Sequence, residues 1–273
     1  MKAGFAQRTI TPPVGCHIVG PVAAATGTHD DLFARVVVLD DGATKVAILA
    51  LDLIGIGWEL ADELRALVCK ASGAHFAALQ FSHTHNSPFP PTWMTSVYDR
   101  DRELLDPWRD MLRAELPAMA AEAAAAVEPV TLRAGRAPVA VGTNRRTMSD
   151  EGVVMHPNPE GPIVPWVDTL SFHAEDGALR GVLFEHAAHP VIVHMASTLF
   201  SADYPGYACN HLAAALGDDV ATLFVQGCGA DINGDPLAAG FEAADAAGKK
   251  LADAVVTAIE TATPLTGNTL TVT

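Results

Sequence analysis

Residues 45–82 read KVAILALDLIGIGWELADELRALVCKASGAHFAALQFS, and this stretch sets the fold class. An apolar run rich in β-branched residues at 45–53 predicts a strand. Residues 58–72 carry apolar side chains at helical spacing and stop before Gly73, a residue typical of helix C-termini. Residues 75–82 then form a second short apolar run, which predicts another strand. The order strand, helix, strand is that of an α/β protein.

The alternation of predicted strands and helices continues along the rest of the chain. Turns at Gly42 and Gly177 join residues 35–41 to 45–53 and 168–173 to 178–186, which predicts two hairpins. The remaining predicted helices cover residues 101–127, 206–216 and 239–261, and the remaining strands cover 130–141, 220–226 and 269–272. The long segments 83–97, 142–165 and 187–204 are predicted to be loops. We therefore expect one α/β domain over residues 1–273, with a mixed β-sheet flanked by helices on both faces.

Composition excludes several classes of function. The chain has 17 Lys+Arg against 32 Asp+Glu, a net charge of −15, and 49% of its residues are hydrophobic. An acidic chain lacks the basic surface that nucleic acids and anionic membranes need, so neither is an expected partner. We find no membrane span and no signal peptide, and we expect a soluble, cytoplasmic protein with free cysteines. The sequence also lacks nucleotide-binding glycine loops and the serine-hydrolase elbow.

Two histidines follow the strand predicted at 75–82. Residues 82–88 read SHTHNSP, and the i, i+2 spacing of His83 and His85 directs both imidazoles to one side of an extended segment. That arrangement suits one metal ion, or one metal ligand beside one acid/base group. Turn and capping histidines at a strand end are the alternative.

A second histidine cluster follows the strand predicted at 178–186. His186, His189 and His194 lie within ten residues, and neutral imidazole is the commonest metal ligand in proteins. We expect one of the three to bind metal. Since open α/β sheets bind ligands beyond the carboxyl ends of their strands, the metal site is predicted at these strand ends.

A glycine-rich turn and an arginine pair complete the candidate set. Residues 224–235 read FVQGCGADINGD, where backbone N–H groups near Gly229 can face a developing oxyanion and Asp231 can orient a histidine or reach a metal. A tight strand-to-helix turn is the alternative there. Asn144 and Arg145, followed by Arg146, can clamp a carbonyl or carboxylate, or form a solvated basic loop.

Together these motifs resemble the catalytic domain of the neutral/alkaline non-lysosomal ceramidase family. The matching pieces occur in family order: RTITPPVG at 8–15, GTHDDLFAR at 27–35, SHTHNSP at 82–88, NRR at 144–146, NP at 158–159, Asp168, HP at 189–190 and SADYPGYA at 201–208. Family members are zinc amidases that hydrolyse N-acyl sphingosines.

By this resemblance, His83 and His189 are zinc ligands, and the step of 14 residues from His189 to Asp203 is what selects His189 over His186. His85 is implied to contact the substrate or the reacting oxygen. The resemblance likewise implies substrate-binding roles for Asn144, Arg145 and Tyr204.

The sequence departs from the family in two places. Asn233 stands where the family has a serine proposed as the nucleophile. The family's remaining zinc ligands, a Glu and a Tyr, come from a region beyond the last predicted helix, and we expect that region and the C-terminal immunoglobulin-like domain to be absent. Candidates to complete the site are Asp203, Asp231, His194 and Asp52.

The sequence therefore predicts a zinc-dependent hydrolase of an N-acyl or cyclic amide, or of an ester or lactone, in which one zinc ion activates a water molecule. His85, Asp231 and Asn233 are the predicted catalytic residues, with His85 as general base or carbonyl contact and Asn233 near the oxyanion. Other divalent metals fit the same ligands. The alternatives are a non-catalytic metal- or ligand-binding protein and a metal-dependent lyase or isomerase. A small-molecule or N-acyl substrate is the expected partner, and homo-oligomer formation is left open.

Overall fold

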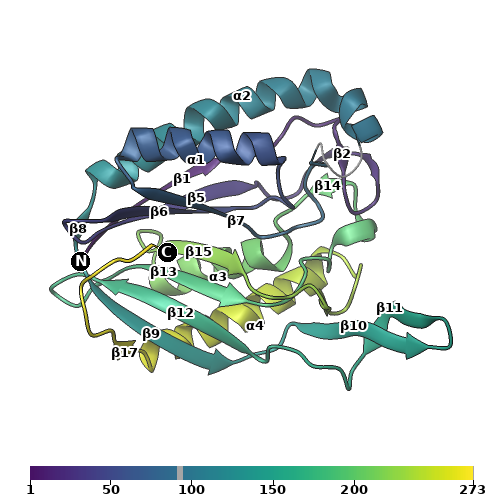
Figure 1. Cartoon of the computed structure of the whole chain (residues 1–273). Helices are drawn as coiled ribbons and strands as arrows, with labels where there is room; N and C mark the ends of the chain where they lie inside the picture. The colour runs from purple at the N-terminus through teal and green to yellow at the C-terminus, as the bar shows by residue number, and fades with distance from the viewer. Residues whose placement is uncertain (91–94, 273) are drawn as a thin grey trace.

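Two five-stranded sheets face each other in the computed structural model, which describes residues 1–90 and 95–272, and helices cover their outer faces (Figure 1). The first sheet has the order β7, β6, β5, β1, β8, with bounds Phe76–Phe81, Lys45–Leu51, Phe33–Asp40, Lys2–Thr9 and Glu128–Pro129. The second has the order β15, β13, β12, β9, β17, with bounds Ala221–Gln226, Leu179–His186, Trp166–His173, Thr131–Pro138 and Thr263–Pro264.

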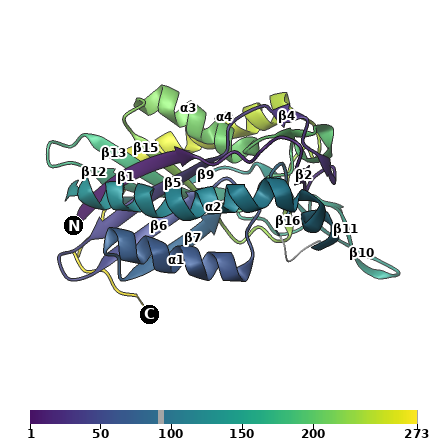
Figure 2. The same ribbon diagram turned by 90° about the horizontal axis from the view of Figure 1, so that it is seen from above.

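The first sheet is built around residues 45–82, which supply β6, β7 and the helix between them. Strand β5 pairs antiparallel with β1 and β6, and β6 pairs parallel with β7 after the crossover helix α1 (Trp58–Ser72). Helix α1 ends at Gly73, which adopts the left-handed φ of 71° typical of a C-cap. Helix α2 (Thr95–Ala125) lies beside α1 over the same face (Figure 2). The strand–helix–strand prediction is confirmed.

The second sheet repeats this plan. Strand β12 pairs antiparallel with β13 and β9, while β13 pairs parallel with the edge strand β15. Helices α3 (Asp203–Leu216) and α4 (Phe241–Glu260) cover its outer face, and their apolar side chains share one core with the sheet. Parallel pairing places the carboxyl ends of β13 and β15 side by side, so the loops that follow both strands leave from one edge.

The α/β class is confirmed, with helices on both outer sides, but these helices enclose two sheets instead of the single predicted one. Strand β5 shows why. Its side chains alternate between the core under α1 and α2 (Val36, Val38) and a smaller apolar layer between the sheets (Val37, Leu39). A continuous apolar run indicates that both faces of a strand are buried, but not which layer covers each face.

Two further predictions are corrected. Residues 142–165, predicted as an irregular loop, contain the hairpin β10 (Gly142–Ser149) and β11 (Gly152–Asn158), and β10 also pairs with β16 (Ile232–Gly234). The side chains of this hairpin are largely exposed, so no apolar alternation marks it. Residues 269–272 form no strand. Part of the predicted loop 83–97, residues 91–94, lies outside the described residues, and α2 already includes residues 95–97.

The remaining elements are short. They are β2 (His17–Ile18), β3 (Ala23–Ala24), β4 (Gly27–Thr28), the 3-10 helix His194–Ala196 and β14 (Leu199–Phe200). Across the part of the chain that the structure describes, none of the helices is long and apolar enough to cross a membrane.

Candidate metal centre

Three histidines meet where the two sheets end. His83 and His85 follow β7 of the first sheet, and His189 follows β13 of the second. Hydrogen bonds join the two loops: the backbone N–H of His85 donates to the Pro190 carbonyl at 3.2 Å, and the Thr84 hydroxyl donates to the Ser201 carbonyl at 2.7 Å. The predicted position at strand ends is thus the place where both sheets contribute histidines.

One ring nitrogen from each of His83, His85 and His189 lies within 4.8 Å of the other two. The ring centroids are 5.4 Å apart for His83 and His85, 4.9 Å for His83 and His189, and 5.8 Å for His85 and His189. Among the described residues, this is the group of His, Cys, Asp and Glu side chains that is placed to hold a metal ion. It contains both predicted ligands, and it adds His85.

Backbone carbonyls fix the tautomers of two of these rings. The Nδ1 atom of His83 lies 2.9 Å from the Ile54 carbonyl, and Nδ1 of His189 lies 2.8 Å from the Gly229 carbonyl and 3.1 Å from that of Ile232. A carbonyl only accepts, so each Nδ1 carries the proton and each Nε2 carries a lone pair. This is the form in which histidine binds a metal, with its other ring N–H held by a backbone acceptor.

Burial keeps these imidazoles neutral. It lowers the pKa of His83, and together with the charge of Arg145 it lowers the pKa of His189 to about 4. Burial also lowers the pKa of His85 to about 2, with smaller contributions from the neighbouring histidines. Because a metal ion binds the deprotonated ring, the donor set fits a divalent cation.

His85 is the most unusual of the three. Within the described chain, both of its ring nitrogens are buried and neither has a hydrogen-bond partner. Buried polar atoms without partners are rare in proteins and point to a bound water or ion, or to a catalytic role. The ring of His194 stands nearly perpendicular to that of His85 at 5.1 Å, and its Nδ1 atom is likewise buried without a partner.

The backbone at this site is strained. His83 and His194 adopt φ values of 69° and 38°, in the left-handed region that non-glycine residues rarely occupy. The Asn86 side chain holds the loop by donating to the carbonyls of His194, Ser197 and Leu199. Such conformations persist only where the surroundings impose them, and they concentrate at functional sites.

Arg145 completes the site from β10. Its guanidinium donates to the Ala230 carbonyl at 2.8 and 3.1 Å and to Oδ1 of Asn233 at 3.0 Å. Its Nη2 atom lies 3.3 Å from Nε2 of His189. The structure therefore brings Arg145 and Asn233 together beside the histidines. Next to them, a small cavity of about 120 Å³ lies between β11 and β16 and is lined in part by Met155, Pro157 and Leu237.

Two residues predicted to bind substrate are buried. Tyr204 was predicted to bind substrate, but it is fully buried in the core of the second sheet and its hydroxyl donates to the Ala188 carbonyl at 2.6 Å. Asn144 is 2% exposed, and its amide donates to the Pro162 carbonyl and to Asp231. Asn144 therefore braces the loop and also lines the small cavity, while Arg145 reaches the histidines.

The acidic candidates are also engaged away from the rings. Asp231 accepts from Asn144, and the carbonyls of Gly229 and Ile232, not the Asp231 carboxylate, orient His189. Asp52 pairs with Arg35 at 2.9 Å, and Asp203 accepts from the backbone N–H groups of Val193 and Tyr204. Sequence reasoning missed the carbonyl partners, because every residue has a carbonyl and none is marked by its side chain.

His186 lies apart from the metal centre, as predicted. It is 1% exposed, and its Nδ1 atom donates to the Trp166 carbonyl.

Comparison with known proteins yields similarity at the level of structure. No protein-family model matches the sequence, and no curated protein matches it closely. Two solved structures resemble it over 95% of its length: a ceramidase complexed with C2, at TM-score 0.79 and 19% identity, and the neutral ceramidase from Pseudomonas aeruginosa, at TM-score 0.77 and 17% identity. The chain covers 44% and 45% of those two chains. It therefore has the fold of under half of a neutral ceramidase, which confirms the resemblance at the level of the fold.

Proposed function

We propose that this chain is a metal-dependent hydrolase that cleaves the amide bond of a small N-acyl or cyclic amide, with zinc held by His83, His189 and His85. The observation that carries the proposal is the set of three ring nitrogens within 4.8 Å of one another, at strand ends of a ceramidase-like fold. Zinc takes three protein ligands at catalytic sites and keeps a further position for water or substrate.

His85 enters the proposal as the third ligand because its geometry favours that use. Its ring nitrogen lies within the same 4.8 Å group as the other two, and its two nitrogens are buried without partners in the described chain. A metal ion would satisfy one of them. His194, packed against the His85 ring, then stands where a second histidine can accept or deliver a proton at Nδ1.

A zinc ion at this centre would supply Lewis-acid chemistry, polarising a carbonyl group and lowering the pKa of water. The chain's own contribution is to place the substrate. Arg145 and Asn233 offer N–H donors beside His189, and they suit a carbonyl oxygen that gains negative charge as its amide is attacked. Since Asn233 is not a nucleophile, we expect attack by water with no acyl-enzyme.

The small cavity beside Arg145 and Asn233 favours a compact substrate. About 120 Å³ is room for a short apolar group, and its wall combines Met155, Pro157 and Leu237 with the polar side chains of Thr143 and Asn233. A short N-acyl group or the ring of a cyclic amide fits this description.

The test is hydrolysis of a panel of short N-acyl amides, cyclic amides, esters and lactones in ¹⁸O-labelled water by zinc-loaded protein. We expect an amide of the panel to be cleaved to an amine and a carboxylate that carries one ¹⁸O atom, and no product from metal-stripped protein. Product formed without ¹⁸O would indicate a lyase or isomerase. Bound zinc with no turnover of any compound would indicate a metal-binding protein without this activity.

A further inference from the structure

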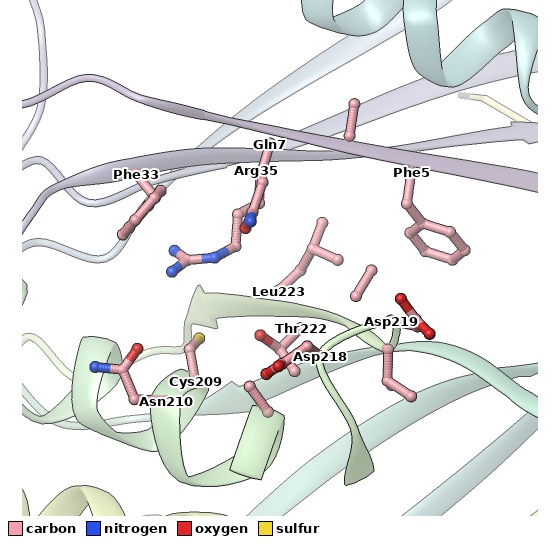
Figure 3. Close-up of a pocket in the computed structure, with 14 residues that line it drawn as sticks. Phe5, Gln7, Phe33, Arg35, Cys209, Asn210, Asp218, Asp219, Thr222 and Leu223 are labelled. Atoms are coloured by element: carbon pink, nitrogen blue, oxygen red, sulfur yellow. The ribbon is translucent and has the colours of Figure 1, made fainter.

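A second cavity lies between the sheets, along the edge formed by β1, β5 and β15. Its volume is about 440 Å³, and 14 residues from these strands, from α3 and from the turn before β15 line it (Figure 3). None of these residues belongs to the metal centre. Among the lining residues that the structure describes, Arg35 is the one with a cationic side chain.

Strand alternation brings Arg35 into this cavity. Val37 and Leu39 project from β5 into the apolar layer between the sheets, and Arg35 lies two positions before Val37 on the same face. Gln7 of β1 pairs with Arg35. The inter-sheet layer is therefore apolar along most of β5 and becomes polar at this end.

The Arg35 guanidinium is buried but incompletely paired. Its side chain is 9% exposed, its Nη1 donates to Oδ2 of Asp52 at 2.9 Å, and the group lies 4.8 Å from the centre of the Phe33 ring. Across residues 1–90 and 95–272, its Nε and Nη2 groups have no protein acceptor, yet neither is sealed from solvent. A buried arginine needs acceptors for its five N–H donors, so water or a ligand in the cavity must supply them.

Charge is distributed unevenly along the cavity. Arg35 lies at one end beside Phe33, whereas Asp219 lies at the other end beside Phe5 (Figure 3). Asp218 and Asp219 are exposed, and Leu223 contributes an apolar surface to the wall. A ligand that fits this pattern has an anionic head, an apolar body, and a far end without negative charge.

We propose that this cavity binds a small monocarboxylate with an apolar body, whose carboxylate accepts from Nε and Nη2 of Arg35. Two parallel N–H donors match the two oxygens of a carboxylate. The carboxylate of Asp219 disfavours a second negative charge at the far end and tolerates a neutral or cationic group there.

The test is calorimetric titration of three six-carbon probes, hexanoate, 6-aminohexanoate and adipate, in a buffer free of carboxylates. The protein is first stripped of metal with 1,10-phenanthroline and desalted, so that binding at the histidines cannot contribute. We expect hexanoate and 6-aminohexanoate to bind, and adipate to bind roughly fivefold more weakly because of the Asp219 carboxylate. No binding of hexanoate, or adipate binding as tightly as hexanoate, would overturn the proposal.

Variants locate the site without breaking the Arg35–Asp52 pair. Ala213→Leu, on the α3 wall, fills the cavity and should weaken hexanoate binding about tenfold, since the ligand must then compete for the same space. Ala214→Leu, the matched control, alters an exposed neighbour outside the cavity and should leave the affinity unchanged. Arg35→Lys keeps the charge beside Asp52 but loses the planar pair of donors, so it should also weaken binding. Equal affinity in the wild type and Ala213→Leu would place the ligand elsewhere.

Discussion

The Nη2 atom of Arg145 lies 3.3 Å from Nε2 of His189, on the lone pair through which that ring would bind a metal. The guanidinium and a metal ion therefore cannot both use this nitrogen. The same arginine also donates to the Ala230 carbonyl and to Oδ1 of Asn233, and these two hydrogen bonds do not require the contact with His189. We therefore expect Arg145 to oppose metal binding, and the proposed function uses it to bind substrate.

Replacing this cation should tighten metal binding. We expect Arg145→Gln to bind zinc about tenfold more tightly than the wild type, a gain of about 1.4 kcal/mol, and to hydrolyse substrate more slowly. Competition with a chromophoric chelator measures the affinity. Arg146→Gln, a change at an exposed neighbour, is the control and should have little effect. Weaker zinc binding by Arg145→Gln would show that the arginine supports the metal site instead of competing for it.

The two unpartnered nitrogens of His85 predict a conflict between stability and function. His85→Leu removes two buried polar atoms that lack partners, so the free energy of unfolding of the metal-free protein should not fall. The affinity for zinc should fall more than about a hundredfold, because a direct ligand is lost. Urea unfolding and chelator competition measure the two quantities. A less stable metal-free variant with normal zinc affinity would contradict the assignment of His85 as a ligand.

Asp203 should make stability depend on pH. Burial raises the pKa of this fully buried carboxyl from 3.8 to about 7. Between these values the folded chain holds a proton that the unfolded chain releases, so the contribution of Asp203 to stability falls as pH rises from about 4 to 7. The resulting loss in the free energy of unfolding is at most about 4 kcal/mol. Urea midpoints of the wild type and Asp203→Asn at pH 4.5 and 7.5 test this prediction, and the variant should lose less stability over that interval. An equal loss in both proteins would exclude the effect.

The burial of Tyr204 predicts a structural role. Tyr204→Phe removes the hydroxyl that donates to the Ala188 carbonyl, which also accepts from Gln226, so the loss of stability should be about 1 kcal/mol. The KM for substrate should not change. Tyr207→Phe is the matched control on the same helix, since its hydroxyl makes only a 3.4 Å contact with His29. A raised KM in Tyr204→Phe but not in Tyr207→Phe would instead support the predicted contact between Tyr204 and the substrate.

Much of the fold and the core of the site could be predicted from the sequence. The apolar run at 45–53, the helical spacing ending at Gly73 and the turn glycines Gly42 and Gly177 each specify local structure, and the structure contains the corresponding elements. His83 and His189 were predicted as ligands and lie together. A local sequence pattern is enough to predict a strand, helix or turn whose structure is determined by one short segment.

The rest depends on contacts between distant segments. The second sheet, the exposed β10–β11 hairpin and the burial of Tyr204 all follow from packing that no single window of sequence records. The position of His85 close to His83 and His189 depends on the Thr84–Ser201 and His85–Pro190 hydrogen bonds between two loops. The predictions of one domain and of a zinc-activated water remain predictions.

Measuring bound zinc tests whether the histidines form a metal site. We would measure zinc by elemental mass spectrometry in the wild type, His83→Ala, His189→Ala and the control His211→Ala, after reconstitution and desalting, and check folding by circular dichroism. His211 pairs with Asp245 on the helical side of the second sheet, away from the centre. We expect about one zinc ion per chain in the wild type and the control, and none in the other two variants. A wild-type chain that stays metal-free, or a folded His83→Ala or His189→Ala variant that keeps its zinc, would contradict this expectation.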